Sequence, residues 1–222
     1  MDLTREIDIY CERVSPELFA EPFNALSNIG FFVAAVLLLR HFGRRGWDFR
    51  TLAALTGLVG VGSVTFHTVA TQWAAIADTL AIAIFIWFYL QRFLVHHARL
   101  GNYSASAFVM SYALTSRLAE RAFPEDAWNG SVMYLPALVT LLAITTWVAM
   151  TKGRLCLPFL IASALFVLSL ALRTMDESVC PIFPTGTHFL WHLLNACVLY
   201  ALGAGLAGFT SRRRRRSSNP HY

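Results

Sequence analysis

Two histidines, His188 and His192, lie four residues apart near the start of the last apolar stretch of the chain. In a helix, side chains at positions i and i+4 lie on one face about one turn apart, so the two imidazoles can share one metal ion. An ionisable side chain inside a membrane-spanning helix is costly and marks a functional site by default. Two core histidines, hydrogen-bonded to neighbouring helices, are the alternative interpretation.

A third histidine, His67, closes an earlier apolar stretch, four residues after Ser63. If the two stretches cross a membrane in opposite directions, His67 ends its helix at the same surface at which His188 and His192 begin theirs. The three imidazoles then meet at one depth and are predicted to bind one metal ion. Three protein ligands and one open position are typical of catalytic zinc sites, in which zinc makes water acidic enough to react near neutral pH.

Asp78 follows His67 by eleven residues, and a helical hairpin of that size can bring the two side chains level. A carboxylate in this place can accept the proton of a water that attacks a substrate and pass it to a leaving group. The hydroxyl of Ser63 can stabilise the oxyanion that forms on an amide carbonyl. The alternative is that Asp78 only complements the N-terminal dipole of its helix. Trp191, next to the ligand pair, is expected to form a wall of the pocket.

The composition is that of an integral membrane protein, because 56% of the 222 residues are hydrophobic and only 14% are charged. Seven stretches are long enough, or nearly so, to cross a bilayer. The sequence therefore predicts an all-α bundle of seven transmembrane helices. They are Leu26–Phe42, Leu52–Val69, Ile76–Val95, Tyr103–Leu118, Val132–Met150, Leu155–Leu172 and Thr187–Gly208.

The basic residues predict the orientation of this bundle. With seven spans, 13 of the 18 lysines and arginines fall on one side, including the run Arg212–Arg216. The positive-inside rule then places the C-terminus in the cytoplasm and the N-terminus outside. The expected parts are an extracytoplasmic segment (1–24), the helical domain (25–209) and a basic cytoplasmic tail (210–222). We interpret that tail as an anchor near anionic lipid, and no nucleic-acid partner is expected.

A polar cluster precedes and enters the first span. Glu21 and Asn24 lie one turn apart around Pro22, which favours the first turn of a helix, and Glu12 lies upstream. Carboxylate and amide oxygens on an outer surface can hold a hard cation such as calcium. Helix capping combined with hydrogen bonds between helices is the alternative.

These motifs, in this order, resemble those of the alkaline ceramidase family, which belongs to a wider group of seven-helix membrane hydrolases that includes the adiponectin-receptor type. The resemblance rests on five groups of residues from the first to the last helix. They are Cys11-Glu12; Glu21, Asn24, Ser27 and Asn28; Gly62, Ser63, Phe66 and His67; Asp78; and His188, Trp191 and His192.

The resemblance implies zinc bound by His67, His188 and His192, with Asp78 and Ser63 contacting the water or the scissile carbonyl. It also implies a substrate that is an N-acylated sphingoid base, and a disulfide between Cys11 and Cys180, which the predicted topology places on the same side. Some members of the family hold calcium in a denser acidic cluster. Here the neighbours of Cys11-Glu12 are Ile9, Tyr10, Arg13 and Val14, so a weakened or absent calcium site is expected.

The expected function is therefore that of a zinc-dependent intramembrane amidohydrolase acting on ceramide-like lipids, in a bacterial inner membrane with its site toward the periplasm. Two alternatives stay open: a metal-bearing lipid receptor or scaffold without turnover, and a membrane redox protein with haem between two histidines. A retinal photoreceptor is excluded, because the only lysine, Lys152, falls in a predicted cytoplasmic loop.

Overall fold

The computed structural model describes residues 2–124 and 127–217, except for the side chains at 154 and 209–217. Within that part the fold is all-helical, as predicted, and the one extended pairing is an isolated bridge between Glu6 and Thr71. The elements are, in chain order, α1 (Pro22–Ser27), α2 (Ile29–Phe42), η1 (Gly43–Arg45), α3 (Trp47–Val69), α4 (Gln72–His96), α5 (Asn102–Glu120), η2 (Ser131–Tyr134), α6 (Leu135–Lys152), η3 (Gly153–Cys156), α7 (Leu157–Val179) and α8 (His188–Ser217).

Six segments of the described chain are long and apolar enough to cross a membrane, so the predicted count of seven spans is not confirmed. The predicted stretch Tyr103–Leu118 does form a helix, α5, but its serines and threonines leave it too polar to be counted. It packs against α4 and the short helix η2. The six segments are Pro22–Arg45, Trp47–Val69, Gln72–His96, Ser131–Lys152, Leu157–Val179 and His188–Gly208.

Helix α7 extends to Val179, seven residues beyond the predicted end at Leu172. The prediction ended at the first charged residue, Arg173, because charges are costly inside a membrane. The helix continues because Arg173 and Asp176 both turn inward and are buried, where they find polar partners. The start of the first helix is as predicted, since Pro22 occupies its first turn.

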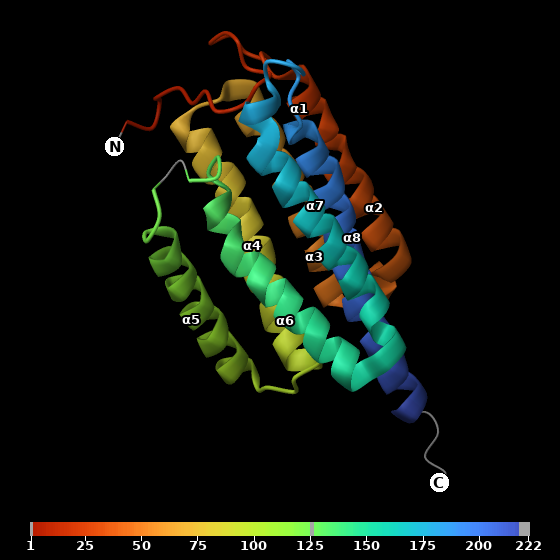
Figure 1. Cartoon of the computed structure of the whole chain (residues 1–222). Coiled ribbons are helices and arrows are strands. Elements are labelled where there is room, and N and C mark those ends of the chain that lie inside the picture. Colours follow the sequence, from red (N-terminus) through yellow and green to blue (C-terminus); the bar gives the residue numbers. More distant parts are fainter. Residues whose placement is uncertain (1, 125–126, 218–222) are drawn as a thin grey trace.

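Helix α8 is the central element of the bundle. It contacts α1, α2, α3, α4 and α7, whereas α3 packs mainly between α2 and α4. Figure 1 shows the helices running roughly side by side, with the N-terminal segment and the end of α8 at opposite ends of the bundle. The expected tail 210–222 is described only as the backbone of α8 up to Ser217, and its remainder lies outside the described residues.

The N-terminal segment is attached to the end of the bundle where α3 finishes and α4 starts. The backbone N–H of Ile7 donates to the carbonyl of Ala70 (2.8 Å), and the N–H of Gln72 donates to the carbonyl of Arg5 (2.9 Å). Ala70 lies in the left-handed conformation that ends α3. This segment therefore covers the same end of the bundle at which α8 begins.

Candidate metal centre

Three histidines from two helices meet at the covered end of the bundle. His67 belongs to the last turn of α3, whereas His188 and His192 belong to the first turns of α8. The ring centroids lie 5.1 Å (67 to 188), 4.6 Å (67 to 192) and 4.7 Å (188 to 192) apart, and no residue of the three is more than 2% exposed. One ring atom from each lies within 4.8 Å of the others. This set can hold a metal ion.

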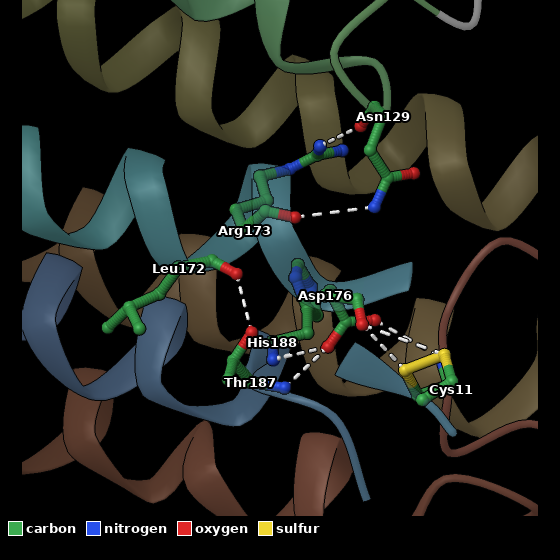
Figure 2. Close-up of a disulfide and its surroundings, with 8 residues drawn as sticks. Cys11, Asn129, Leu172, Arg173, Asp176, Thr187 and His188 are labelled. Atoms are coloured by element: carbon green, nitrogen blue, oxygen red, sulfur yellow. Dashed lines mark hydrogen bonds between the residues drawn. A yellow bond between two sulfur atoms is a disulfide. The ribbon is translucent and has the colours of Figure 1, made fainter. Parts of the chain in front are cut away.

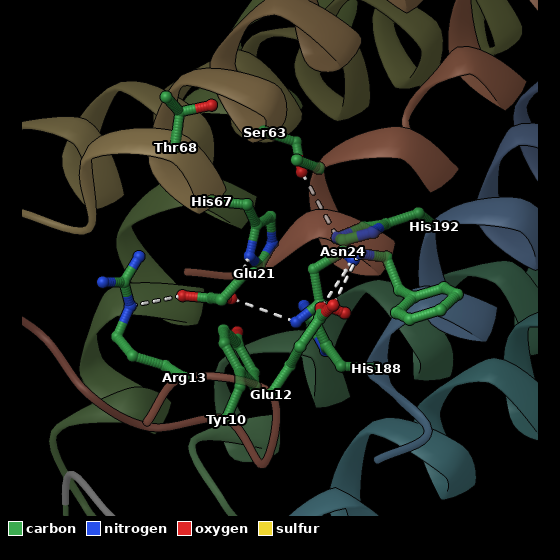
Figure 3. Close-up of polar contacts among 12 residues, drawn as sticks. Tyr10, Glu12, Arg13, Glu21, Asn24, Ser63, His67, Thr68, His188 and His192 are labelled. Atoms are coloured by element: carbon green, nitrogen blue, oxygen red, sulfur yellow. Dashed lines mark hydrogen bonds and ion pairs between the residues drawn. The ribbon is translucent and has the colours of Figure 1, made fainter. Parts of the chain in front are cut away.

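Glu21 fixes the orientation of His67. The Nδ1 atom of His67 lies 2.6 Å from Oε2 of Glu21. Because the carboxylate accepts, Nδ1 carries the proton and Nε2 presents its lone pair to the centre. Burial raises the pKa of Glu21, but hydrogen bonds from His67, Asn24 and Arg13 outweigh it and hold this pKa below its ordinary value. Glu21 is therefore ionised near neutral pH, in the position that Figure 3 shows.

Ser27 has the corresponding role for His192. Its Oγ lies 2.7 Å from Nδ1 of His192 and donates its own proton to the carbonyl of Asn24 (2.8 Å). A hydroxyl has a single proton, so Nδ1 of His192 must be the donor in the hydrogen bond that it shares with Ser27. Nε2 of His192 is then free to act as a ligand, 3.3 Å from Oγ of Ser63.

His188 is positioned through its ring and its backbone. The ring stacks on Tyr10, with centroids 3.7 Å apart and planes 18° from parallel. The backbone N–H of His188 donates to Oδ1 of Asp176 (2.8 Å), which also accepts from the N–H of Thr187 (2.6 Å). Asp176 thus satisfies backbone donors at the start of α8, where a helix has no acceptors of its own.

The disulfide between Cys11 and Cys180 joins the N-terminal segment to the end of α7 (Figure 2). Oδ2 of Asp176 accepts from the N–H of Cys11 (3.0 Å), so one carboxylate links this segment to α8. The turn before α8 contains Gly186, at φ +61°, and a Cβ at this glycine would collide with Oδ1 of Asp176. A side chain is therefore excluded from this turn.

Among the fully buried ring nitrogens of the cluster, two have no hydrogen-bond partner in the described part of the chain. They are Nε2 of His67 and Nδ1 of His188, and both are buried. A buried polar atom without a partner is costly and requires an explanation such as an ion. The described residues contain no other group of three or more potential ligands of this kind. Three imidazoles with an open position fit a transition metal such as zinc.

Asp78 lies on α4 at its close approach to α3. A Cβ on Gly62 would lie 3.0 Å from the Cα of Asp78, so the glycine allows the two backbones to come this near. Oδ1 of Asp78 is buried and accepts no hydrogen bond from the described residues. Asp78 makes no direct hydrogen bond to the three histidines in the described part of the chain.

Glu12 caps the first helix. Its two carboxylate oxygens accept from the backbone N–H groups of Phe23 (2.5 Å) and Asn24 (2.8 Å), which have no acceptor within α1. Burial raises the pKa of Glu12 in spite of these two hydrogen bonds. Both carboxylates of the predicted polar cluster, Glu12 and Glu21, thus have protein partners. These contacts correspond to the capping interpretation of that cluster.

An apolar cavity lies in the bundle beside the histidines, which do not themselves line it. Trp191 lines it together with Phe31, whose ring lies 6.4 Å from that of His192. Along α8 the lining extends from Trp191 to Leu202, three helical turns or about 16 Å. Only a few hydroxyls and one amide interrupt its apolar walls. Its length along α8 and its apolar walls suit a hydrocarbon chain.

Arg173, which the sequence analysis did not assign, connects several aromatic residues around the site. Its guanidinium lies over the rings of Tyr10, Tyr134 and Trp191, at 5.8, 5.4 and 5.8 Å from their centroids. It donates to the carbonyl of Asn129, as Figure 2 shows, and to the hydroxyl of Tyr10 (3.3 Å). The one sign of this role in the sequence is that Arg173 directly follows an apolar stretch. A charge in that place is equally typical of the end of a helix.

The comparison with known families agrees with this geometry. The family model described as Ceramidase matches residues 4–221, nearly the whole chain, and so includes every residue of the centre. No curated protein sequence matches the chain. Because the match extends from the N-terminal segment through α8, the chain belongs to the ceramidase family.

Proposed function

We propose that this protein is a zinc-dependent amidohydrolase that cleaves the N-acyl amide of ceramide-like lipids within the membrane, giving a fatty acid and a sphingoid-type amine. The observation that carries the proposal is the convergence of three buried imidazoles, next to an apolar cavity that Trp191 and Phe31 line. Membership of the ceramidase family supports the same reaction.

The histidines would hold the metal through Nε2 of His67, Nε2 of His192 and one nitrogen of His188. Hydrogen bonds of Nδ1 to Glu21 and Ser27 orient the first two rings, as carboxylate and hydroxyl partners do in other metal sites. Zinc supplies a Lewis acid and makes water acidic enough to attack at neutral pH. The sequence and the geometry fit this ion because three neutral imidazoles leave one position for water.

Two side chains are proposed to handle the proton and the developing charge. The buried carboxylate of Asp78 accepts a proton from the attacking water and then delivers it to the nitrogen of the leaving amine, so that the C–N bond breaks without a free amide anion. The hydroxyl of Ser63 donates a hydrogen bond to the carbonyl oxygen as negative charge forms there. Water thereby adds its OH to the acyl carbon and its H to the amine.

The substrate is proposed to lie with its acyl chain in the cavity and its amide beside Trp191. A second, shallower groove between α5 and α6 shares Tyr112 and Thr140 with the cavity lining. A lipid can therefore reach the centre sideways between these helices, while water arrives from the end covered by the N-terminal segment.

The proposed orientation places the metal centre outside the cytoplasm, with α5 as a seventh crossing and the C-terminus inside. The connections at the end of the bundle opposite the histidines, together with the run Arg212–Arg216 at the end of α8, carry 13 of the 18 lysines and arginines, as the positive-inside rule requires of a cytoplasmic side. In a bacterial inner membrane the centre would face the periplasm. Labelling of single cysteines introduced in the 97–101 loop with an impermeant reagent tests this, since they should react only after permeabilisation.

The test of the function uses purified protein in detergent. Elemental analysis should find about one zinc per chain, and ceramide added to this protein should release fatty acid and amine in equal amounts. Asp78→Asn should lose hydrolysis while keeping zinc, whereas Asp8→Asn, at an exposed aspartate, should change neither. Visible absorbance would instead indicate haem, and zinc without turnover on any N-acyl lipid would indicate a receptor or scaffold.

A further inference from the structure

Arg13 is a buried cation in the N-terminal segment, only 7% exposed. Its Nε donates to Oε1 of Glu21 at 2.6 Å. Its Nη1 donates to the carbonyl oxygens of Ser15 (3.1 Å) and Glu17 (3.4 Å). One carboxylate and two main-chain carbonyls thus converge on a single guanidinium, in a part of the chain outside the apolar helices.

The same carboxylate links this cation to the metal centre. While Oε1 of Glu21 binds Arg13, its Oε2 accepts from Nδ1 of His67 (2.6 Å) and from the side-chain amide of Asn24 (3.0 Å). Figure 3 shows Arg13 and His67 on opposite sides of Glu21. The contacts form a continuous chain from the guanidinium through a carboxylate to one of the three imidazoles.

The oxygens around Arg13 are of the types that hard divalent cations bind. The other acidic residue of the polar cluster, Glu12, uses both of its oxygens to cap α1. Among the described residues, Glu21 forms ion pairs with Arg13 and His67. Of these two partners only Arg13 is always charged, since His67 is charged only when protonated. A guanidinium cannot lose its proton in a protein, so this charge is constant over the physiological pH range.

We propose that Arg13 is a positioning residue that acts as a built-in cation for this cluster. It holds the Glu21 carboxylate in place, directed at Nδ1 of His67, and so sets the affinity of the centre for its metal without a second, dissociable divalent ion. This inference rests on the proposed function only in taking the histidines to bind zinc. Without Arg13, Oε1 of Glu21 would lose the one donor that holds it, the carboxylate could turn away, and its hydrogen bond to His67 would weaken.

The experiment measures the dissociation constant of zinc by competition with a chelator, using the full-length protein in detergent. Arg13→Met should raise this constant roughly 10- to 100-fold, the usual effect of losing an outer-shell partner. Arg13→Lys should lose less, because it retains the charge. Arg5→Met is the matched control: Arg5 lies in the same segment but is exposed and contacts Gln72, so the zinc affinity should stay unchanged.

Chemical rescue separates a local cation from a general loss of structure. Methylguanidinium added to Arg13→Ala should restore zinc affinity to within several-fold of the wild type, because it can occupy the space beside Glu21. Calcium added to the wild type should leave the zinc affinity unchanged. An Arg13→Met variant that binds zinc as tightly as the wild type would overturn the proposal, and so would a wild type whose zinc affinity depends on calcium.

If the methionine and alanine variants fail to fold, Arg13→Lys and the calcium titration of the wild type still decide the matter. A lysine variant that is folded but binds zinc as weakly as a His67→Ala protein would show that charge alone is insufficient and would contradict the built-in cation. Hydrolysis is not measured in any of these steps. A wild type that binds zinc through this chain of contacts but cleaves no amide would refute the proposed function and leave the role of Arg13 intact.

Discussion

Oδ1 of Asp176 accepts a hydrogen bond from the backbone N–H of His188, 2.8 Å away, and so fixes the first residue of α8 from the end of α7. The same carboxylate accepts from the N–H groups of Thr187 and Cys11. Asp176 touches none of the ligand nitrogens. It nevertheless decides where the ligand-bearing helix starts, because three backbone donors from two distant segments depend on it.

Replacement of Asp176 by Ala should destabilise the protein and weaken zinc binding together. The change leaves three N–H groups without their acceptor, and each unsatisfied buried donor costs about 1–3 kcal/mol. Asp176→Asn should do less harm, since its oxygen can still accept from Thr187 and His188, but its NH₂ group then faces the N–H of Cys11. Thermal unfolding in detergent and zinc competition measure the two effects.

The neighbouring Glu177→Gln provides the control for the Asp176 variants. Glu177 lies on the same helix turn but is exposed, so its replacement should change neither unfolding nor zinc affinity. An Asp176→Ala protein with the unfolding temperature of the wild type would show that the start of α8 is held by other contacts.

The disulfide should be demonstrable by alkylation. Of the four cysteines, Cys156 and Cys197 are free, so two should react in the denatured, unreduced protein and four after reduction. The double change Cys11→Ser and Cys180→Ser should release zinc several-fold faster, because the segment that stacks Tyr10 on His188 loses its covalent attachment. Equal release rates in the wild type and the double variant would mean that hydrogen bonds, among them those to Asp176 and Ala70, hold this segment without the disulfide.

The histidine centre can be predicted from the sequence because it depends on two simple features, the spacing of residues within a helix and the direction in which each helix crosses the membrane. The i and i+4 spacing of His188 and His192 fixes their common face, and the direction of two apolar helices fixes the depth of His67. A helix that crosses a bilayer of known thickness has few possible positions along its axis. The convergence of residues more than one hundred positions apart therefore follows from helix periodicity and topology.

The partners of these histidines could not be predicted in the same way. Arg13, Ser27 and Asp176 act through side-chain contacts whose geometry depends on how loops and helix ends pack, and no spacing rule gives that packing. A charged residue after an apolar stretch can end a helix or turn inward, and only burial against a partner decides between the two, as it does for α7. Whether α5 crosses the membrane also depends on its neighbours.

The cavity should set the acyl-chain preference. Ala137, on α6, lines it, so Ala137→Phe would fill space that a long chain occupies and should shift the preference toward shorter chains by about tenfold. Leu142→Phe, on the same helix at an exposed position, should leave the preference unchanged. Competition between short-chain and long-chain ceramides in one reaction measures the ratio. An unaltered ratio in Ala137→Phe would place the acyl chain elsewhere.

The stability of the protein should fall with acidification, in part through His97, directly after α4. Burial lowers the pKa of His97 to about 3 from an ordinary 6.5, and the charges of His96 and Lys152 act in the same direction. The unfolded chain therefore binds a proton below pH 6.5 that the folded protein refuses until about pH 3. The stability that His97 contributes is complete above pH 6.5 and is lost as the pH falls through this window.

The slope of this loss is at most about 1.4 kcal/mol per pH unit for one group. His97→Asn should reduce the slope of unfolding free energy against pH by up to that amount, whatever it does to the stability at pH 7. Denaturant titrations in detergent at several pH values between 4 and 7 measure the slopes. Equal slopes for the wild type and His97→Asn would mean that His97 takes up its proton in the folded state as readily as in the unfolded chain.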